Sequence, residues 1–131
     1  MNWFLAKTEP GTYSLDDLER DKRTVWDGVK NPQAVRAIRD MRPGDNVFIY
    51  HSGGQSSIVG VARVVSEPRD DPKDKKSAVV ELEFARRLDK PVTLAEVRAS
   101  NLFADWALVR QPRLSTMRVP ESFVKWMKSH E

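Results

Sequence analysis

The chain begins with a short run, Asn2–Ala6, in which Trp, Phe, Leu and Ala follow one another without a polar residue between them. Neighbouring side chains of a strand point to opposite faces, so a strand here is apolar on both faces. Such a strand is expected to be buried. The polar cluster Lys7-Thr8-Glu9-Pro10 follows directly. The sequence therefore places polar side chains and free backbone amides at the end of a buried strand.

Other segments predict a mixture of short strands and short helices. Further strands are expected at residues 25–26, 46–51, 57–65 and 78–84, with 46–51 and 57–65 joined as a hairpin across a glycine-containing link. Helices are expected to begin at Ser14, Asn31, Thr93 and Pro120, of which the first three suit the N-cap. These elements predict the α+β class, with a small, strongly curved sheet or barrel of five to six strands and several short helices packed around it.

Three segments are expected to lie outside these elements. Residues 68–76 are polar, contain two prolines and are expected to form a surface loop. Residues 102–108 are expected to form a turn or a helix, and residues 110–118 an irregular basic segment. A chain of 131 residues suffices for one core, and we expect residues 1–131 to form a single domain.

The composition limits the chemistry that the chain can perform. It contains no cysteine, which excludes disulfides, thiolate nucleophiles and thiolate metal sites. Its 22 basic residues face 19 acidic ones, so a nucleic-acid surface would have to come from clustering of the cations. No apolar run is long enough to span a bilayer, and no signal peptide is recognisable. We therefore expect a cytoplasmic protein with no membrane partner, and a monomer.

Trp26 is a candidate for contact with a flat ligand. It precedes Asp27 and Gly28, so it is expected near a bend, where an indole can line a cleft. Base–aromatic stacking contributes about 1–3 kcal/mol per base. The alternative is a tryptophan of the core or its rim. Trp106, near a basic stretch, fits either role.

The cluster after the first strand could read the edge of a ring stacked on Trp26. Lys7 can donate a hydrogen bond, Glu9 can accept one, and Thr8 can do both. The alternative is a solvated exit from the strand.

The sequence Tyr50-His51-Ser52 invites a hydrolase interpretation, which the pattern disfavours. His51 and Ser52 are adjacent in an expected strand and point to opposite faces, and no nucleophile elbow is present. The other histidine, His130, is distant in sequence, so neither a metal site nor a cofactor is expected. His51 is a candidate hydrogen-bonding group of a pocket, and no residue is assigned a catalytic role.

Several basic side chains could form a rim that contacts a phosphate backbone. They are Lys30, Arg36, Arg39, Arg110, Arg113 and Arg118. The alternative is a solvated, mixed-charge surface.

Several motifs, in this order along nearly the whole chain, resemble the EVE domain family of the PUA-like superfold, a relative of the YTH domains that read methylated adenine in RNA. They are Trp3–Pro10, Trp26–Asn31, Gly44-Asp45 with Phe48–Ser52, Gly60–Ala62, Pro91–Leu94 and Leu108–Ser115. The resemblance implies a small β-barrel surrounded by helices, with a pocket beside the first strand. It also implies binding of a modified base, with modified cytosine in DNA as the leading candidate.

The family's motifs also imply the residues of the site. Its Lys-Ser-Glu-Pro falls on Lys7–Pro10 with Thr8 in place of serine, and its Trp-Asp-Gly-Val-Arg-Asn falls on Trp26–Asn31 with Lys30 in place of arginine. The expected ligand-binding residues are Lys7, Thr8, Glu9, Trp26, Asn31, Tyr50, His51, Ser52, Trp106, Arg113 and Ser115. The expected contacts to a nucleic-acid backbone are Lys30, Arg36, Arg39 and Arg110.

The sequence thus predicts a non-catalytic reader of a modified nucleobase, with DNA favoured over RNA as its partner. The base would be flipped from the duplex into an aromatic pocket. Alternatives are a module that binds a small molecule or nucleoside, a reader of modified RNA, a protein-interaction domain, and an enzyme that uses His51 and Glu9 as acid and base. Salt-independent binding of free nucleosides would favour the first of these alternatives.

Overall fold

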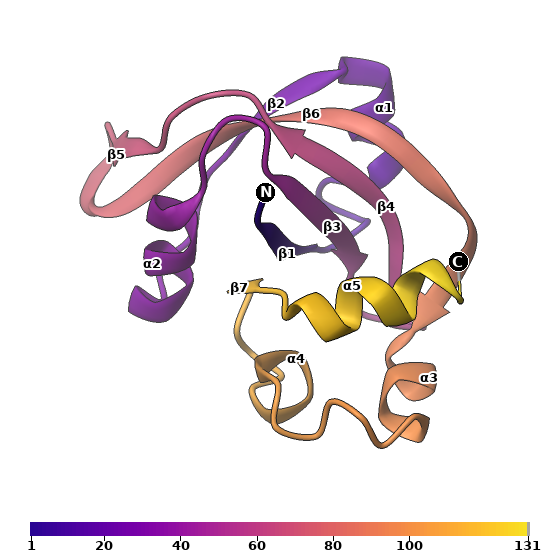
Figure 1. Cartoon of the computed structure of the whole chain (residues 1–131). Coiled ribbons are helices and arrows are strands. Elements are labelled where there is room, and N and C mark those ends of the chain that lie inside the picture. The colour runs from indigo at the N-terminus through magenta and orange to yellow at the C-terminus, as the bar shows by residue number, and fades with distance from the viewer. Residues whose placement is uncertain (131) are drawn as a thin grey trace.

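The computed structural model describes residues 1–130 and shows a mixed sheet curled into half of a barrel, with helices around it (Figure 1). The strands are β1 (Trp3–Thr8), β2 (Arg23–Trp26), β3 (Asn46–His51), β4 (Ser57–Val64), β5 (Arg69–Asp71), β6 (Asp74–Thr93) and β7 (Thr116–Arg118). The helices are α1 (Leu15–Asp21), α2 (Pro32–Asp40), α3 (Leu94–Ala99), α4 (Ala107–Arg110) and α5 (Glu121–Lys128). The predicted α+β, PUA-like fold is confirmed, with seven strands in place of five or six.

The first strand occupies the inside of the sheet, whose order is β2-β6-β4-β3-β1-β7. It pairs in parallel with β3 and antiparallel with β7, so both of its edges are filled. Phe4, Leu5 and Ala6 are fully buried, as the unbroken apolar run predicts. The strand continues through Lys7 and Thr8, so the polar cluster begins inside the strand and not after it.

Two segments expected to be irregular contain strands. Within residues 68–76, β5 pairs with the start of β6, and the two prolines, Pro68 and Pro72, lie before β5 and in the turn between the strands. Proline and charge indicate a turn correctly but hide the short strands beside it. Within residues 110–118, Thr116–Arg118 form β7, a strand too short for alternation of polar and apolar residues to reveal.

The helices begin where the capping residues predict. Ser14 and Thr93 each form a capping box, and the Asn31 side-chain oxygen accepts hydrogen bonds from two amides of the first turn of α2. The helix α5 lies across the curled sheet (Figure 1), where the Phe123 ring meets the Phe48 ring of β3 at 6.0 Å between centroids. Within residues 1–130, no helix combines the length and the apolar character needed to cross a bilayer.

The contact between α1 and β4 depends on a missing side chain. A Cβ at Gly60 would lie 2.7 and 2.8 Å from the two methyl carbons of Leu15 and 2.9 Å from the Arg86 carbonyl oxygen. Leu15 is fully buried at the start of α1. Glycine at position 60 therefore allows α1 to pack directly on the sheet.

We expect Gly60→Ala to lower the free energy of unfolding by about 1–3 kcal/mol, because the added methyl overlaps both a packed side chain and a backbone oxygen. The measurement is urea denaturation followed by circular dichroism. Gly11→Ala is the control, since a Cβ at Gly11 meets no atom within 4 Å. Equal denaturation midpoints for the two variants would contradict the close packing described here.

Candidate functional site

A cleft of about 520 Å³ lies beside the carboxyl end of β1. Its walls come from the end of β1, the turn that follows, the segment from β2 to α2, and the loop before β7. The lining residues are Lys7, Thr8, Thr12, Tyr13, residues 24–31, Arg113 and Ser115. This volume falls within the range of about 300–1,000 Å³ found for small-molecule sites.

Two aromatic side chains meet in the wall of the cleft. The ring of Tyr13 approaches Trp26 edge-on, with centroids 6.5 Å apart and planes at 81°. Trp26 is the last residue of β2 and is only 9% exposed, so a limited part of the indole faces the cleft. Gly28 has a φ of 75° and turns the chain from β2 toward α2. Trp26 is thus both a core residue and part of the lining.

Lys7 joins β1 to the loop before β7. Its backbone amide donates to the carbonyl of Ser115 at 2.8 Å, and its Nζ donates to the carbonyl of Pro112 at 2.9 Å. The same Nζ lies 5.3 Å from the centroid of the Tyr50 ring, and burial lowers the pKa of Lys7. The ammonium carries two further N–H groups, and Lys7 is among the residues that line the cleft. Tyr50, predicted as a ligand contact, lies outside the lining residues and supports Lys7.

A tight turn returns the chain to the cleft. The Thr8 hydroxyl donates to the carbonyl of Tyr13 at 2.7 Å, and the carbonyl of Glu9 accepts the amides of Thr12 and Tyr13. The exposed side chain of Glu9 is not among the lining residues. The turn therefore places Thr12 and Tyr13, which the sequence did not single out, beside Thr8.

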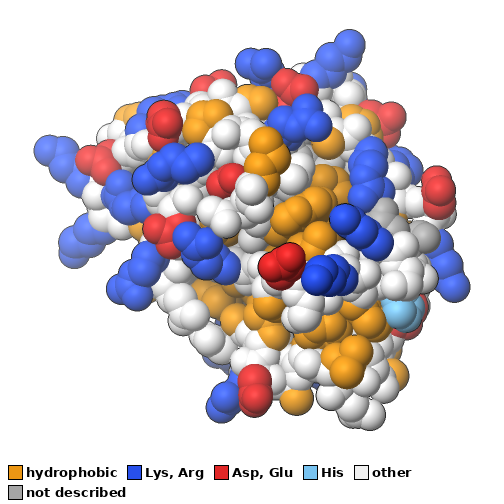
Figure 2. Space-filling model, in the orientation of Figure 1, with side chains coloured by type: hydrophobic (Ala, Val, Ile, Leu, Met, Phe, Trp, Pro, Cys, Tyr) orange, Lys and Arg blue, Asp and Glu red, His pale blue; other side chains and the backbone are white. Residues whose placement is uncertain are grey.

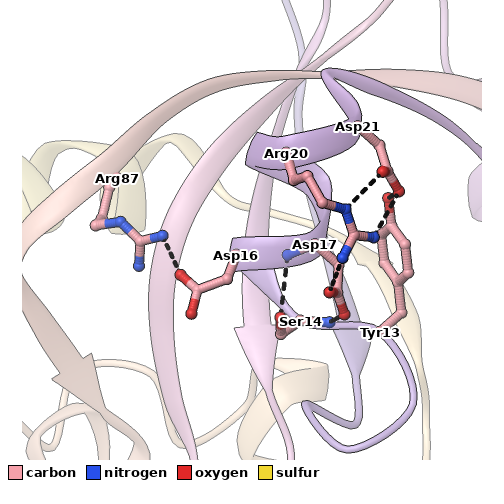
Figure 3. Close-up of polar contacts among 7 residues, drawn as sticks. All are labelled: Tyr13, Ser14, Asp16, Asp17, Arg20, Asp21 and Arg87. Atoms are coloured by element: carbon pink, nitrogen blue, oxygen red, sulfur yellow. Dashed lines mark hydrogen bonds and ion pairs between the residues drawn. The ribbon is translucent and has the colours of Figure 1, made fainter.

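A polar network on α1 fixes Tyr13 (Figure 3). The phenol donates to a carboxylate oxygen of Asp21 at 2.9 Å, and Arg20 bonds to the same carboxylate. Burial is the main reason why the pKa of Tyr13 is raised, so the phenol is neutral at physiological pH. Arg87 of β6 bonds to Asp16 and holds the other side of the helix. The aromatic wall thus depends on the placement of α1.

His51 and Ser52 are not among the residues that line the cleft. The Nε2 atom of His51 accepts a hydrogen bond from the backbone amide of Leu15 at 3.0 Å, at the start of α1. Burial is the main reason why the pKa of His51 is lowered, which favours the neutral ring that this bond requires. Ser52 bonds to the carbonyl of Thr8 through its amide at 2.9 Å. Both residues hold elements that form the cleft.

Of two further predicted ligand contacts, Asn31 lines the cleft and Trp106 does not. Trp106 packs with Phe123 at 4.5 Å between ring centroids, and its Nε1 donates to the carbonyl of Arg118 at 2.9 Å. It is not among the lining residues of the cleft. Asn31 lines the cleft, but its side-chain oxygen caps α2, so its amide N–H groups are the ones available there.

Four of the six basic side chains of the predicted phosphate-contacting rim are paired with acidic side chains. The pairs are Lys30 with Asp74 at 3.3 Å, Arg39 with Asp70 at 3.0 Å, Arg110 with Asp105 at 3.8 Å and Arg118 with Asp40 at 3.4 Å. Figure 2 shows acidic side chains interspersed among the basic ones on the face it presents. Within residues 1–130, Arg36 and Arg113 make no ion pair. Of the six cations, Lys30 and Arg113 line the cleft.

The EVE domain family model matches residues 2–130. The chain belongs to the EVE domain family. It is 31% identical to thymocyte nuclear protein 1 of Rattus norvegicus, and the match covers 74% of this chain and 55% of that protein. The chain therefore spans about half the length of the curated relatives it matches. The predicted family is confirmed, whereas the cytoplasmic location expected for this chain stays a prediction beside relatives named as nuclear.

Solved structures of similar proteins share this fold. The NMR structure of a protein from Rhodopseudomonas palustris is 35% identical, with a TM-score of 0.90 and coverage of 96% of this chain and 90% of that one. The crystal structure of human THYN1 in complex with DNA containing 5-methylcytosine is 24% identical, with a TM-score of 0.86 and coverage of 100% and 99%.

Because the folded state lowers the pKa of His51, the unfolded chain binds a proton at higher pH than the folded chain. We expect stability to fall as the pH drops below about 6.5, the ordinary histidine pKa, and to stop falling from this source below the lowered pKa. His51→Gln keeps an acceptor but does not titrate, so it should flatten this change. The measurement is urea denaturation at several pH values.

His130→Gln is the matched control, because it removes the other histidine and leaves the bond between His51 and Leu15 in place. It should retain the pH dependence. The interpretation fails if His51→Gln shows the same loss of stability between about pH 7.5 and 5.5 as the unaltered protein.

Proposed function

We propose that the chain binds a modified nucleobase of DNA in the cleft beside β1, without catalysing a reaction. The observation that carries this proposal is the meeting of Trp26, Tyr13 and the half-buried Lys7 ammonium in one cleft of suitable size. Membership of the EVE family supports the proposal. The fold shared with human THYN1, solved with DNA containing 5-methylcytosine, makes that base the first to test.

The polar groups of the cleft match the edge of cytosine. The exocyclic amine of cytosine is a donor, and its ring nitrogen and carbonyl oxygen are acceptors. Lys7 provides a donor and the Asp27 carboxylate provides an acceptor, and both residues line the cleft. Tyr13 and the accessible part of Trp26 provide aromatic surface, and because their planes stand at 81° a base stacks on one of the two rings.

A methyl group on the base adds a small apolar contact. Val25 and Val29 line the cleft and provide apolar surface. One buried methyl contributes about 0.8 kcal/mol, which corresponds to about a fourfold preference. We therefore expect modest discrimination between 5-methylcytosine and cytosine, and greater discrimination against bases with a different polar edge.

The mouth of the cleft suits a phosphate backbone. Arg113 is exposed and makes no ion pair within residues 1–130, and Lys30 is held only by an exposed pair with Asp74. Solvent screens such an exposed pair and leaves it a small contribution to stability, so a phosphate can replace the carboxylate at low cost. Binding to an oligonucleotide should therefore weaken as salt rises.

The placement of the histidines favours binding over catalysis. His51 caps α1, and His130 stacks on Trp126 with ring centroids 3.9 Å apart. Neither His51 nor His130 is among the residues that line the cleft, and the chain has no cysteine. The cleft thus offers groups that hold a ring and lacks the most frequent general base and the most reactive nucleophile.

The experiment is fluorescence anisotropy with labelled oligonucleotides that carry cytosine, 5-methylcytosine, 5-hydroxymethylcytosine or N6-methyladenine. DNA and RNA are compared as single strands and duplexes at two salt concentrations. We expect tighter binding of DNA with 5-methylcytosine. Equal affinity for all bases would contradict the proposal, and salt-independent binding of free nucleosides alone would favour a small-molecule module.

We expect Trp26→Phe to weaken binding of the preferred oligonucleotide by about threefold to tenfold, because the smaller ring loses part of the stacking surface. Phenylalanine is used because Trp26→Ala would empty a buried position and destabilise the fold by about 3–5 kcal/mol. Trp126→Phe, on α5, is the matched control and should bind normally. The role of Trp26 is refuted if both variants bind like the unaltered protein.

A further inference from the structure

Next to the cleft, a second hollow of about 390 Å³ lies between α2 and β7, which pack against each other. We call it the α2–β7 groove. Its polar lining consists of Gln33, Arg36 and Asp40 from α2, and Thr116 and Arg118 from β7. No part of the base-binding mechanism above uses these five side chains.

Thr116 is the unusual residue of the groove. The side chain is fully buried, and its Oγ1 is the one buried side-chain polar atom within residues 1–130 that has no hydrogen-bond partner. Native proteins pair nearly all such atoms, so an unpaired hydroxyl on a residue that lines a hollow needs a reason. A polar ligand in the groove would provide the missing partner.

The charges of the groove point to an anionic ligand. Arg36 is exposed and makes no ion pair within residues 1–130. Arg118 pairs with Asp40 at 3.4 Å across the groove, so these two charges largely cancel and Arg36 leaves a net positive charge. The Gln33 amide adds further hydrogen-bonding groups. Guanidinium, amide and hydroxyl groups together suit the oxygens of a sugar and a phosphate.

The groove and the cleft are lined from the same two segments, 31–33 and 113–116, with residues of each segment facing one hollow or the other. Asn31 lines the cleft, and Gln33, two residues later, lines the groove. On the other side, Ser115 lines the cleft, and the next residue, Thr116, lines the groove. A strand that has one base in the cleft and crosses residues 113–116 brings its next nucleotide to the groove. The Thr116 hydroxyl has almost no exposed surface in the free protein, so a ligand reaches it when neighbouring side chains of the lining shift. Exposed side chains such as those of Arg36 and Arg118 change rotamer within nanoseconds.

We propose that the α2–β7 groove binds the sugar and phosphate of a nucleotide that flanks the base in the cleft. This inference rests on the proposed function. Arg36 contacts the phosphate, and the Thr116 hydroxyl bonds to an oxygen of the sugar or phosphate. The groove thus determines the path of the strand, while the cleft selects the base.

The test compares free 5-methyldeoxycytidine, which reaches only the cleft, with a single-stranded DNA oligonucleotide that carries one 5-methylcytosine. Arg36→Gln should weaken oligonucleotide binding about threefold to tenfold and reduce the salt dependence by about one phosphate contact. Thr116→Val, which replaces the hydroxyl by a methyl of similar size, should weaken it about twofold to tenfold. Both variants should bind the free nucleoside like the unaltered protein.

Two controls separate binding from folding. Arg98→Gln makes the same change of charge on α3, away from the groove, and should leave both affinities unchanged. Thr116→Val should keep or raise the thermal midpoint of the free protein, because the hydroxyl has no partner there. A lower midpoint would show that the hydroxyl is already paired and would overturn its assignment to a ligand.

The outcomes distinguish the groove from the cleft. If Arg36→Gln and Thr116→Val bind the oligonucleotide like the unaltered protein and base preference is intact, the assignment of the groove to a flanking nucleotide is wrong. The proposed function then still stands. Loss of nucleoside binding in these variants would also contradict the assignment of the groove, because the groove and the cleft would then not act as separate sites. Absence of base preference in the unaltered protein would overturn the proposed function and the flanking-nucleotide assignment together.

Discussion

The pairing of β1 on both of its edges is the constraint on which the site depends. Its parallel partner is β3 and its antiparallel partner is β7, so the beginning of the chain and the segment near its end share one sheet. Lys7 makes two hydrogen bonds to the loop before β7, one to Pro112 and one to Ser115. A wall of the cleft is therefore closed between residues more than a hundred positions apart. Without β7, the cleft would lose Arg113 and Ser115 and would open toward solvent.

The position of α1 is determined mainly by apolar packing. Burial of a side chain such as Leu15 contributes about 1.5–3 kcal/mol, whereas solvent screens an exposed ion pair such as Arg20 with Asp17 and leaves it a much smaller contribution. The ion pairs of Figure 3 orient side chains on a helix that Leu15 and Gly60 have already placed. The bond from Leu15 to His51 satisfies an amide at the start of the helix. Tyr13, just before α1, reaches the cleft as a result.

Local signals in the sequence were sufficient for most elements and for part of the site. The caps at Ser14, Asn31 and Thr93 are local chemistry, and they predicted three helix starts correctly. Pairing between distant segments is not local, so β7 was missed and the long bent strand β6 was only partly predicted. The motifs and the basic side chains identified Lys7, Thr8, Trp26, Lys30, Asn31, Arg113 and Ser115, which the structure brings together in one cleft. Tyr13 was missed because its place in the wall depends on a turn and on the packing of α1.

The closure of the cleft by residues 112–115 also affects how the protein folds during its synthesis. A ribosome releases the chain from its beginning, so β1 emerges long before the loop that completes the wall beside Lys7. During most of synthesis the edge of β1 that β7 later covers is unpaired, which makes it a place where a nascent chain can associate wrongly. Once the loop is in place, a ligand in the cleft contacts both ends of the sheet at once. Its binding energy then adds to the stability of the whole fold and not only to that of the cleft.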